Sequence, residues 1–449
     1  MASTTTATRA PSRTSIGKVV FASLIGTSIE WYDFFLYGSA AALVFGPLFF
    51  PESEPAAATM LAFGTYAIGF VARPLGGIIF GHFGDRLGRK TMLVVSLLLM
   101  GAATFAIGLL PTHATVGIAA PLLLLTCRML QGFAVGGEWG GAVLMAAEHG
   151  DDARRGFWSS WPQAGVPAGN LLSAAVLWVL AAVQSDQDFQ VWGWRIPFLL
   201  SALLVLIGMW VRLSIEESPV FAEAKAVREA EPDKRAPLLQ VIRNYPREVL
   251  IAMGLRMTEN IGYYMFSIVV LTYLVTYLHM PKSVAIVGVL AGSAAQLVLT
   301  PVIGGLSDRV GRRPLYLIGA IGTGIWGFVF FPMVDTGDQL MITLAIVIGL
   351  SFTTFMYAPQ AALFSELFGT TVRYSGASLG YQLASVFAGG LAPMISVALL
   401  GTVDERNTTA VSIYLAIAAV ITLVAAVAAK ETAGSSLRHD RTINKLGSS

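Results

Sequence analysis

The sequence predicts an all-α membrane protein with twelve transmembrane helices in two pseudo-symmetric six-helix bundles. Of the 449 residues, 55% are hydrophobic and only 12% are charged, whereas soluble domains contain about 25% charged residues. Twelve apolar segments reach the roughly 20 residues that one bilayer crossing needs. A short charged motif also recurs after the second and the eighth segment, which indicates two related halves.

The twelve apolar segments follow one another with short connections. They span residues 18–46, 57–80, 91–110, 118–147, 157–183, 195–214, 248–279, 283–304, 314–332, 338–366, 374–400 and 408–430. One long hydrophilic segment of mixed charge separates six helices from six. The predicted organisation is therefore an N-terminal tail (1–17), a first bundle (18–214), a cytoplasmic linker (215–247), a second bundle (248–430) and a C-terminal tail (431–449). The linker is interpreted as a spacer with a surface helix, and a regulatory role is the alternative.

The distribution of positive charge predicts the orientation. An even number of crossings puts both termini on one side. Of 29 Lys and Arg residues, only Arg195, Lys282 and Arg406 fall on the opposite side. Because Lys and Arg accumulate in cytoplasmic loops, both termini are expected in the cytoplasm, in a cell (plasma or inner) membrane. The first 17 residues lack the apolar core of a signal peptide, so the first helix is expected to direct insertion.

Composition and motifs argue against several other classes. The net charge of +2 is too small to indicate nucleic-acid binding. Cys127 is the only cysteine, and it reads as a small packed residue. Because the sequence has no metal-ligand cluster, phosphate-binding loop or nucleophile arrangement, neither a cofactor nor an enzymatic activity is expected. The alternative of a different class is a non-transporting sensor or an intramembrane enzyme.

The recurring motif G-x-x-x-D-R-x-G-R occupies the same place in both halves, as "GHFGDRLGRK" (81–90) and "GGLSDRVGRR" (304–313). A second repeat sets a glutamate seven residues before an arginine, after the fourth and the tenth helix. Glycine permits a tight turn and close helix approach, and a nearby aspartate can pair with arginine. The motif therefore serves turn formation and topology, and we also expect it to act as a gate. The gating residues expected from these repeats are Gly81, Asp85, Arg86, Gly88, Arg89, Glu148, Arg155, Asp308, Arg309, Gly311, Arg312, Glu366 and Arg373.

Five charged residues are predicted at overlapping depths in the bilayer. At about 1.5 Å per residue, Glu30 and Asp33 lie roughly 18 and 22 Å from the start of the first helix. Arg128 lies near the middle of the fourth helix, and Arg256 and Glu259 share one face of the seventh. A charge at this depth is costly and is expected to be paired. Such pairs can be purely structural, or they can bind substrate and move protons.

Two further charged residues interrupt apolar segments. Arg73 precedes Pro74 in the second helix, where it can extend its charge to the membrane surface or contribute to a gate. Glu138 lies between glycines in "GGEWGG", which allow close helix packing, and a gating role is favoured over packing alone.

Several stretches resemble the metabolite:proton symporter family of the major facilitator superfamily over nearly the whole chain. They are "EWYDFFLYG" (30–38), "ARPLGGIIFGHFGDRLGRK" (72–90), "RMLQGFAVGGEWGGA" (128–142), "WGWRIPF" (192–198) and "EESPVF" (216–221). The match looks closest to the shikimate-type branch and is related to the proline/betaine and 2-oxoglutarate transporters. The resemblance implies the major facilitator fold, alternating access, and uptake driven by a proton gradient.

A mechanism follows as a hypothesis. Arg128 and Arg256 attract a substrate carboxylate, for which a guanidinium suits better than lysine. Asp33, Glu30 and Glu259 are the candidates for proton coupling, because a carboxylate in an apolar helix beside a second carboxylate can take up a proton. Further candidates for the substrate wall, each of which could equally serve helix packing, are Tyr263, Tyr264, Gln163, Asn170, Gln296, Tyr357, Gln360 and Gln382.

The expected function is therefore proton-coupled uptake of a small polar metabolite, with an organic acid such as shikimate or a keto or dicarboxylic acid as first choice. A proline/betaine-type zwitterion symporter is the alternative, and a proton-driven exporter is a weaker one, suggested by "QAGVPAG" (163–169). The expected partners are the small-molecule substrate, protons and the lipid bilayer. Nucleic acid is not expected as a partner, and an oligomer is not required.

Overall fold

The computed structural model describes residues 16–87, 89–136, 152–213, 241, 243–368 and 373–434. All regular elements among them are helices. The long helices of the first half are α1 (Ile16–Ala40), which continues as η1 (Ala41–Phe45) and α2 (Gly46–Phe49), then α3 (Pro55–Leu87), α4 (Arg89–Leu109), α6 (Ala119–Val135), α8 (Arg155–Val183) and α10 (Arg195–Leu213). Short elements between them are α5 (His113–Val116), η2 (Asp152–Arg154), α9 (Asp186–Asp188) and η3 (Phe189–Gly193).

The second half repeats this organisation. Its helices are α13 (Pro246–Tyr264), which continues through η4 (Met265–Val269), α14 (Val270–Thr272) and η5 (Tyr273–Tyr277), then α15 (Lys282–Val310), α16 (Arg312–Val334), α17 (Gln339–Leu367), α18 (Arg373–Ser385), which continues through η6 (Val386–Gly390) and α19 (Leu391–Leu400), and α20 (Thr408–Ala428). A helix therefore occupies each of the twelve predicted segments, although the described part of the fourth ends at Val135.

By length and apolar composition, nine described helices can cross a membrane, or ten if the bent pair Asp186–Gly193 and Arg195–Val211 is one span. The apolar parts of α4 and α6 among the described residues, Val94–Leu109 and Ala119–Val135, are shorter. Large apolar side chains on the outside, such as Trp210 (72% exposed), are suited to contact with lipid. The chain is a multi-pass membrane protein.

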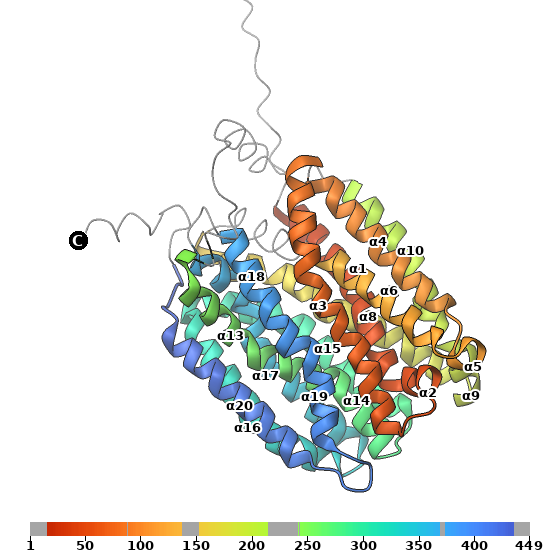
Figure 1. The fold of residues 1–449 in the computed structure, drawn as a ribbon. Coiled ribbons are helices and arrows are strands. Elements are labelled where there is room, and N and C mark those ends of the chain that lie inside the picture. The colour runs from red at the N-terminus through yellow and green to blue at the C-terminus, as the bar shows by residue number, and fades with distance from the viewer. Residues whose placement is uncertain are drawn as a thin grey trace, which may run out of the picture.

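The two halves lie side by side, with most red-to-yellow helices in one group and the green-to-blue helices in the other (Figure 1). Across their interface α8 packs on α15, and α3 packs on α19. A Cβ atom on Gly304 of α15 would overlap Ser160 of α8, so this crossing is close enough to require glycine. We call the end of the bundle where α1 and α8 begin and α20 ends the terminal face, and the other end the opposite face.

Within the first half, α3 and α6 touch through glycine. A Cβ atom at Gly132 would overlap the carbonyl oxygen of Gly69, and one at Gly136 would overlap that of Arg73. The backbone of α6 therefore lies directly against α3 beside Arg73. Around this contact, aromatic side chains of α1, α3 and α13 form the largest buried cluster. The polar groups described next are embedded in this cluster.

Candidate functional site

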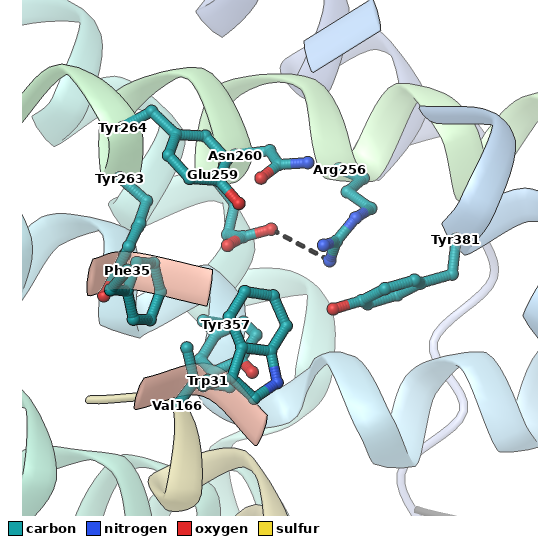
Figure 2. Close-up of a pocket in the computed structure, with 10 residues that line it drawn as sticks. All are labelled: Trp31, Phe35, Val166, Arg256, Glu259, Asn260, Tyr263, Tyr264, Tyr357 and Tyr381. Carbon is teal, nitrogen blue, oxygen red and sulfur yellow. Dashed lines mark hydrogen bonds and ion pairs between the residues drawn. The ribbon is translucent and has the colours of Figure 1, made fainter. Parts of the chain in front are cut away.

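A pocket lies between the halves, enclosed by aromatic side chains and one ion pair (Figure 2). Its empty volume is about 260 Å³, which includes the part that opens to its surroundings. The lining residues are Trp31, Phe35, Val166, Arg256, Glu259, Asn260, Tyr263, Tyr264, Tyr357 and Tyr381. They come from α1 and α8 on one side and from α13, α17 and α18 on the other. A ligand held here would touch both halves at once.

Arg256 is the charged group of the pocket, and several partners fix its position. Its Nη1 lies 3.3 Å from Oε2 of Glu259 and 2.7 Å from Oε1 of Gln360, and its Nε donates to Ser385. The Tyr381 ring lies under the guanidinium, 3.3 Å from Cζ to the ring centroid. Arg256 and Glu259 were predicted to lie at similar depths on one helix face, and in the structure they form an ion pair of two buried groups. The positive and negative charges of the pair balance.

Arg128 does not pair with a carboxylate of the first helix. In the part of the chain that the structure describes, its guanidinium lies over Phe34, Tyr37 and Tyr66, at 4.3 to 4.5 Å from the ring centroids. Its Nη1 donates to Gln131. The ion pair expected from depth alone is replaced by cation–π contacts, because neighbouring helices bring rings rather than oxygen atoms to the guanidinium.

Asp33 is reached from Arg128 only through other side chains. Gln131 accepts from Arg128 and donates to the Thr104 hydroxyl at 2.7 Å, and Thr104 neighbours the Asp33 carboxyl group. Asp33 is 2% exposed, and its Oδ1 has no hydrogen-bond partner within the described residues. Glu30, one helical turn away, is also buried. Asp33 is therefore a buried acid connected to Arg128 by a short polar path.

Arg73 is only 1% exposed, so the expectation that it extends to the membrane surface is wrong. Its guanidinium lies 4.3 Å from the ring centroids of Phe34 and Phe70 and 5.5 Å from that of Trp31. Its Nε and Nη2 have no hydrogen-bond acceptor among the residues described. The close contact of α3 with α6 leaves this side chain no route to the surface.

The predicted substrate-wall residues divide into two groups. Tyr263, Tyr264 and Tyr357 line the pocket, and Gln360 binds both Arg256 and Glu259. The other four join helices: Gln163 donates to the Tyr357 carbonyl, Asn170 to Ser293, Gln296 to residues of α17, and Gln382 to the Gly136 carbonyl. Of these, Gln163, Asn170 and Gln382 connect the two halves.

At the terminal face, four charged side chains form a buried network that we call the terminal-face cluster: Arg155, Asp308, Arg312 and Glu366. Glu366 Oε1 accepts from Arg155 at 2.8 Å and from Arg312 at 3.3 Å. Asp308 lies 2.8 Å from Arg312. It also accepts from the backbone N–H groups of Gly156 and Phe157 at the start of α8. The cluster therefore fastens the first half to the second.

Other predicted gating residues are less informative. Arg309 points to the exterior and Gly311 has a φ of 104°, which glycine adopts without strain. Gly81 lies within α3. The side chains of Asp85, Arg86, Arg89 and Arg373 lie outside the described part, as do Gly88, Glu138 and Glu148. Of the second repeat, the structure shows Glu366 on Arg155 and Arg312.

The residues after α20 join the terminal-face cluster. The Glu431 carboxylate accepts backbone N–H bonds from Arg312 and Arg313 at the start of α16, and the Thr432 hydroxyl donates to Glu366. Arg313 in turn donates to the Ala426 and Val427 carbonyls at the end of α20. Each helix end thus provides the other with a cap.

Glu431→Gln removes a charged cap and is expected to lower the free energy of unfolding by roughly 0.5–2 kcal/mol. The unfolding temperature should fall accordingly. Partial burial opposes ionisation, but four backbone N–H donors outweigh it and hold the pKa of Glu431 below its usual range. The stabilisation is therefore present above the unfolded value of about 4.3 and disappears as the pH falls through the lower folded value. Thermal unfolding is measured in detergent from pH 7.5 into the acid range. The unfolding temperatures of the wild type and Glu431→Gln should converge as the pH falls. Glu405→Gln, in an exposed loop, is the matched control, and a difference that persists unchanged in acid would contradict the assignment.

Contacts also close the opposite side of the pocket. Lys282 at the start of α15 pairs with Asp186 at 3.0 Å. A Cβ atom on Gly38 of α1 would overlap Ile268 of η4, and Thr272 donates to the Ala42 carbonyl. The halves therefore touch on both sides of the pocket.

Comparisons with known proteins agree with this geometry. Residues 24–380 and 255–440 match the family described as Major Facilitator Superfamily. The chain belongs to this superfamily. The shikimate transporter of Escherichia coli K12 is 40% identical over 92% of this chain and 94% of its own length. The inner membrane metabolite transport protein YhjE of the same organism is also 40% identical, over 94% and 96%.

The proline/betaine transporter of E. coli K12 is 34% identical over 94% of this chain and 85% of the relative. Among solved structures, the proton:xylose symporter XylE superposes with a TM-score of 0.72 at 19% identity, covering 94% of this chain and 97% of the other. That likeness confirms the predicted major facilitator fold. The predicted family is confirmed as well, and its members named here are transporters.

Sequence reasoning missed five residues that line the pocket: Trp31, Phe35, Val166, Asn260 and Tyr381. Trp31 and Asn260 are each the direct neighbour of a predicted acid, and Tyr381 directly precedes Gln382. Adjacent residues of a helix point about 100° apart, so a wide pocket admits both. The aromatic residues next to the charged positions were the feature of the sequence from which these pocket residues could have been predicted.

Proposed function

We propose that this protein is a proton-coupled symporter that takes up a small organic acid by alternating access. The observation that carries the proposal is the pocket between the halves, which is lined by a balanced Arg256–Glu259 pair and by aromatic rings from both halves. A carboxylate substrate suits buried arginines. The 40% identity to a shikimate transporter supports shikimate or a similar acid as the first candidate.

The coupling step uses the buried acids. Asp33 takes up the proton, with Glu30 and Glu259 as the other candidates, and the path through Thr104 and Gln131 relates its charge to Arg128. We further propose that the termini are cytoplasmic, so that the terminal-face cluster is the inner gate. Release of Glu366 from Arg155 would open the pocket towards the cytoplasm, and release of Lys282 from Asp186 would open it outwards.

The aromatic walls favour one second candidate, a quaternary ammonium zwitterion such as betaine. Rings around a cation attract it through cation–π contacts, and a proline/betaine transporter is 34% identical. In that case Glu259 would face the cationic group of the ligand.

Uptake into proteoliposomes tests the proposal. Purified protein is reconstituted, an inward proton gradient is imposed, and accumulation of labelled shikimate, 2-oxoglutarate, proline and glycine betaine is measured with and without a protonophore. Protonophore-sensitive accumulation of an acid is the expected result. Gradient-driven efflux of the acid would instead identify an exporter, and accumulation of betaine alone would support the second candidate.

A further inference from the structure

Two buried arginines of the first half, Arg73 and Arg128, have no ion pair among the described residues. Arg256 has Glu259 at 3.3 Å, and Arg155 and Arg312 share Glu366. Among the described residues, Arg73 has no ion pair, and its Nε and Nη2 have no acceptor. A buried charge without a partner is costly, and native structures rarely retain one without a use.

Arg73 is also placed next to the pocket. Trp31 contacts both: it lines the pocket, and its ring centroid lies 5.5 Å from the Arg73 guanidinium. Arg73 is also within electrostatic range of Tyr264 and Tyr381, which line the pocket. Arg128, by contrast, stacks on Phe34, Tyr37 and Tyr66, none of which lines it. A rotation of the Trp31 side chain would connect the guanidinium to the pocket.

We propose that Arg73 receives the carboxylate of the substrate and that the site is built for a monoanion. This rests on the proposed function and names the substrate class more narrowly. Arg256 and Glu259 cancel each other's charge. Arg128 is connected to the acid Asp33 through Gln131 and Thr104. Arg73 therefore leaves one positive charge for the ligand to balance. The neutral Arg256–Glu259–Gln360 group then provides donors and acceptors for hydroxyl groups on the rest of the molecule. The preferred substrate is a small hydroxylated monocarboxylate.

The position of Arg73 on α3 gives this contact a mechanical consequence. Its helix is fixed to α6 by glycine contacts and packs across the interface on α19. A carboxylate bound to Arg73 while its hydroxyl groups bind α13 would therefore hold the first half to the second. Binding both halves through one ligand is what favours the occluded state over either open state.

Binding of an acid and of its neutral ester to purified protein tests the assignment. Isothermal titration with shikimate and methyl shikimate compares wild type, Arg73→Gln, and Arg406→Gln as the matched control in a partly exposed loop site. The wild type is expected to prefer the acid. Arg73→Gln should weaken shikimate binding on the order of 100-fold while ester binding changes little, so that the preference disappears. An acid preference that survives in Arg73→Gln would overturn the proposal.

Two further measurements keep the test decisive. If Arg73→Gln does not fold, Arg73→Lys is used, which keeps the charge and loses the planar fork: weaker shikimate binding with the acid still preferred supports the proposal, and an unchanged Kd overturns it. In wild type, tighter binding of 2-oxoglutarate or glycine betaine than of shikimate would refute the monoanion class. Failure of the proposed function is a different result, namely wild-type protein that binds the acid but shows no proton-driven uptake.

Discussion

Asp33→Asn is expected to abolish proton-driven accumulation while leaving substrate exchange intact. Asp33 is buried, and within the described residues it has no ion pair and its Oδ1 has no hydrogen-bond partner. As an ion it is therefore a buried charge without a cation beside it, unlike Glu259, which has Arg256. An asparagine keeps the shape and the neutral state, so the carrier can reorient without a proton.

The size of this effect follows from the gradient. One coupled proton and a pH difference of about one unit provide about 1.36 kcal/mol, which supports roughly tenfold accumulation of the acid. The variant should reach only equal concentrations on both sides. Uptake into proteoliposomes with an acid outside pH measures accumulation, and counterflow of labelled substrate at equal pH measures exchange.

The matched control is Asp404→Asn in an exposed loop, and Glu30→Gln tests the neighbouring acid. Accumulation by both Asp33→Asn and Glu30→Gln that remains uphill and protonophore-sensitive would show that the first helix does not carry the proton. Loss of exchange together with accumulation in Asp33→Asn would assign the residue to substrate binding or folding instead.

Glu366→Gln is expected to release the terminal face and shift the protein towards a state open on that side. Glu366 holds Arg155 from the first half and Arg312 from the second. Its neutralisation removes the carboxylate that Arg155 and Arg312 share, and breaking a buried pair in this way costs about 3–5 kcal/mol. Because tenfold in an equilibrium corresponds to about 1.4 kcal/mol, the closed state would lose roughly 100-fold or more of its population advantage.

A single reporter cysteine can detect this shift. Ser160 is fully buried at the crossing of α8 with α15, so Ser160→Cys in a Cys127→Ser background should react slowly with a membrane-impermeant maleimide. Adding Glu366→Gln should accelerate the reaction at least tenfold, and adding Glu405→Gln should not. An unchanged rate in Glu366→Gln protein that still binds substrate would show that the terminal-face cluster does not control this side.

The fold was predictable because a bilayer imposes one strong rule on sequence. Each crossing needs a long apolar stretch, and all of its backbone polar groups must bond within the helix. The predicted segment 338–366 therefore differs by one residue at each end from α17, Gln339–Leu367. Continuation of helices beyond the apolar part, as in α3 to Leu87 and α15 to Val310, was underestimated, since charged residues outside the membrane extend a helix without changing hydropathy.

The candidate site was only partly predictable, because depth does not fix the direction of a side chain. Arg256 and Glu259 share one helix face, and the spacing alone placed them together. Arg128 and the acids of the first helix have similar depths, but their contacts depend on helix rotation, which a single sequence does not contain. The place of Arg73 also depends on Gly132 and Gly136, whose role is visible only when α6 lies against α3.

The short segment after the last helix has a practical consequence. Glu431 and Thr432 contact Arg312 and Glu366 of the terminal-face cluster. A truncation at Lys430 would therefore remove contacts to the cluster that joins the two halves. An affinity tag or a fluorescent reporter should be attached beyond Gly434. A fusion made directly to Ala428 would lack Glu431 and Thr432. The fusion itself would then change the contacts of the terminal-face cluster in the protein being measured.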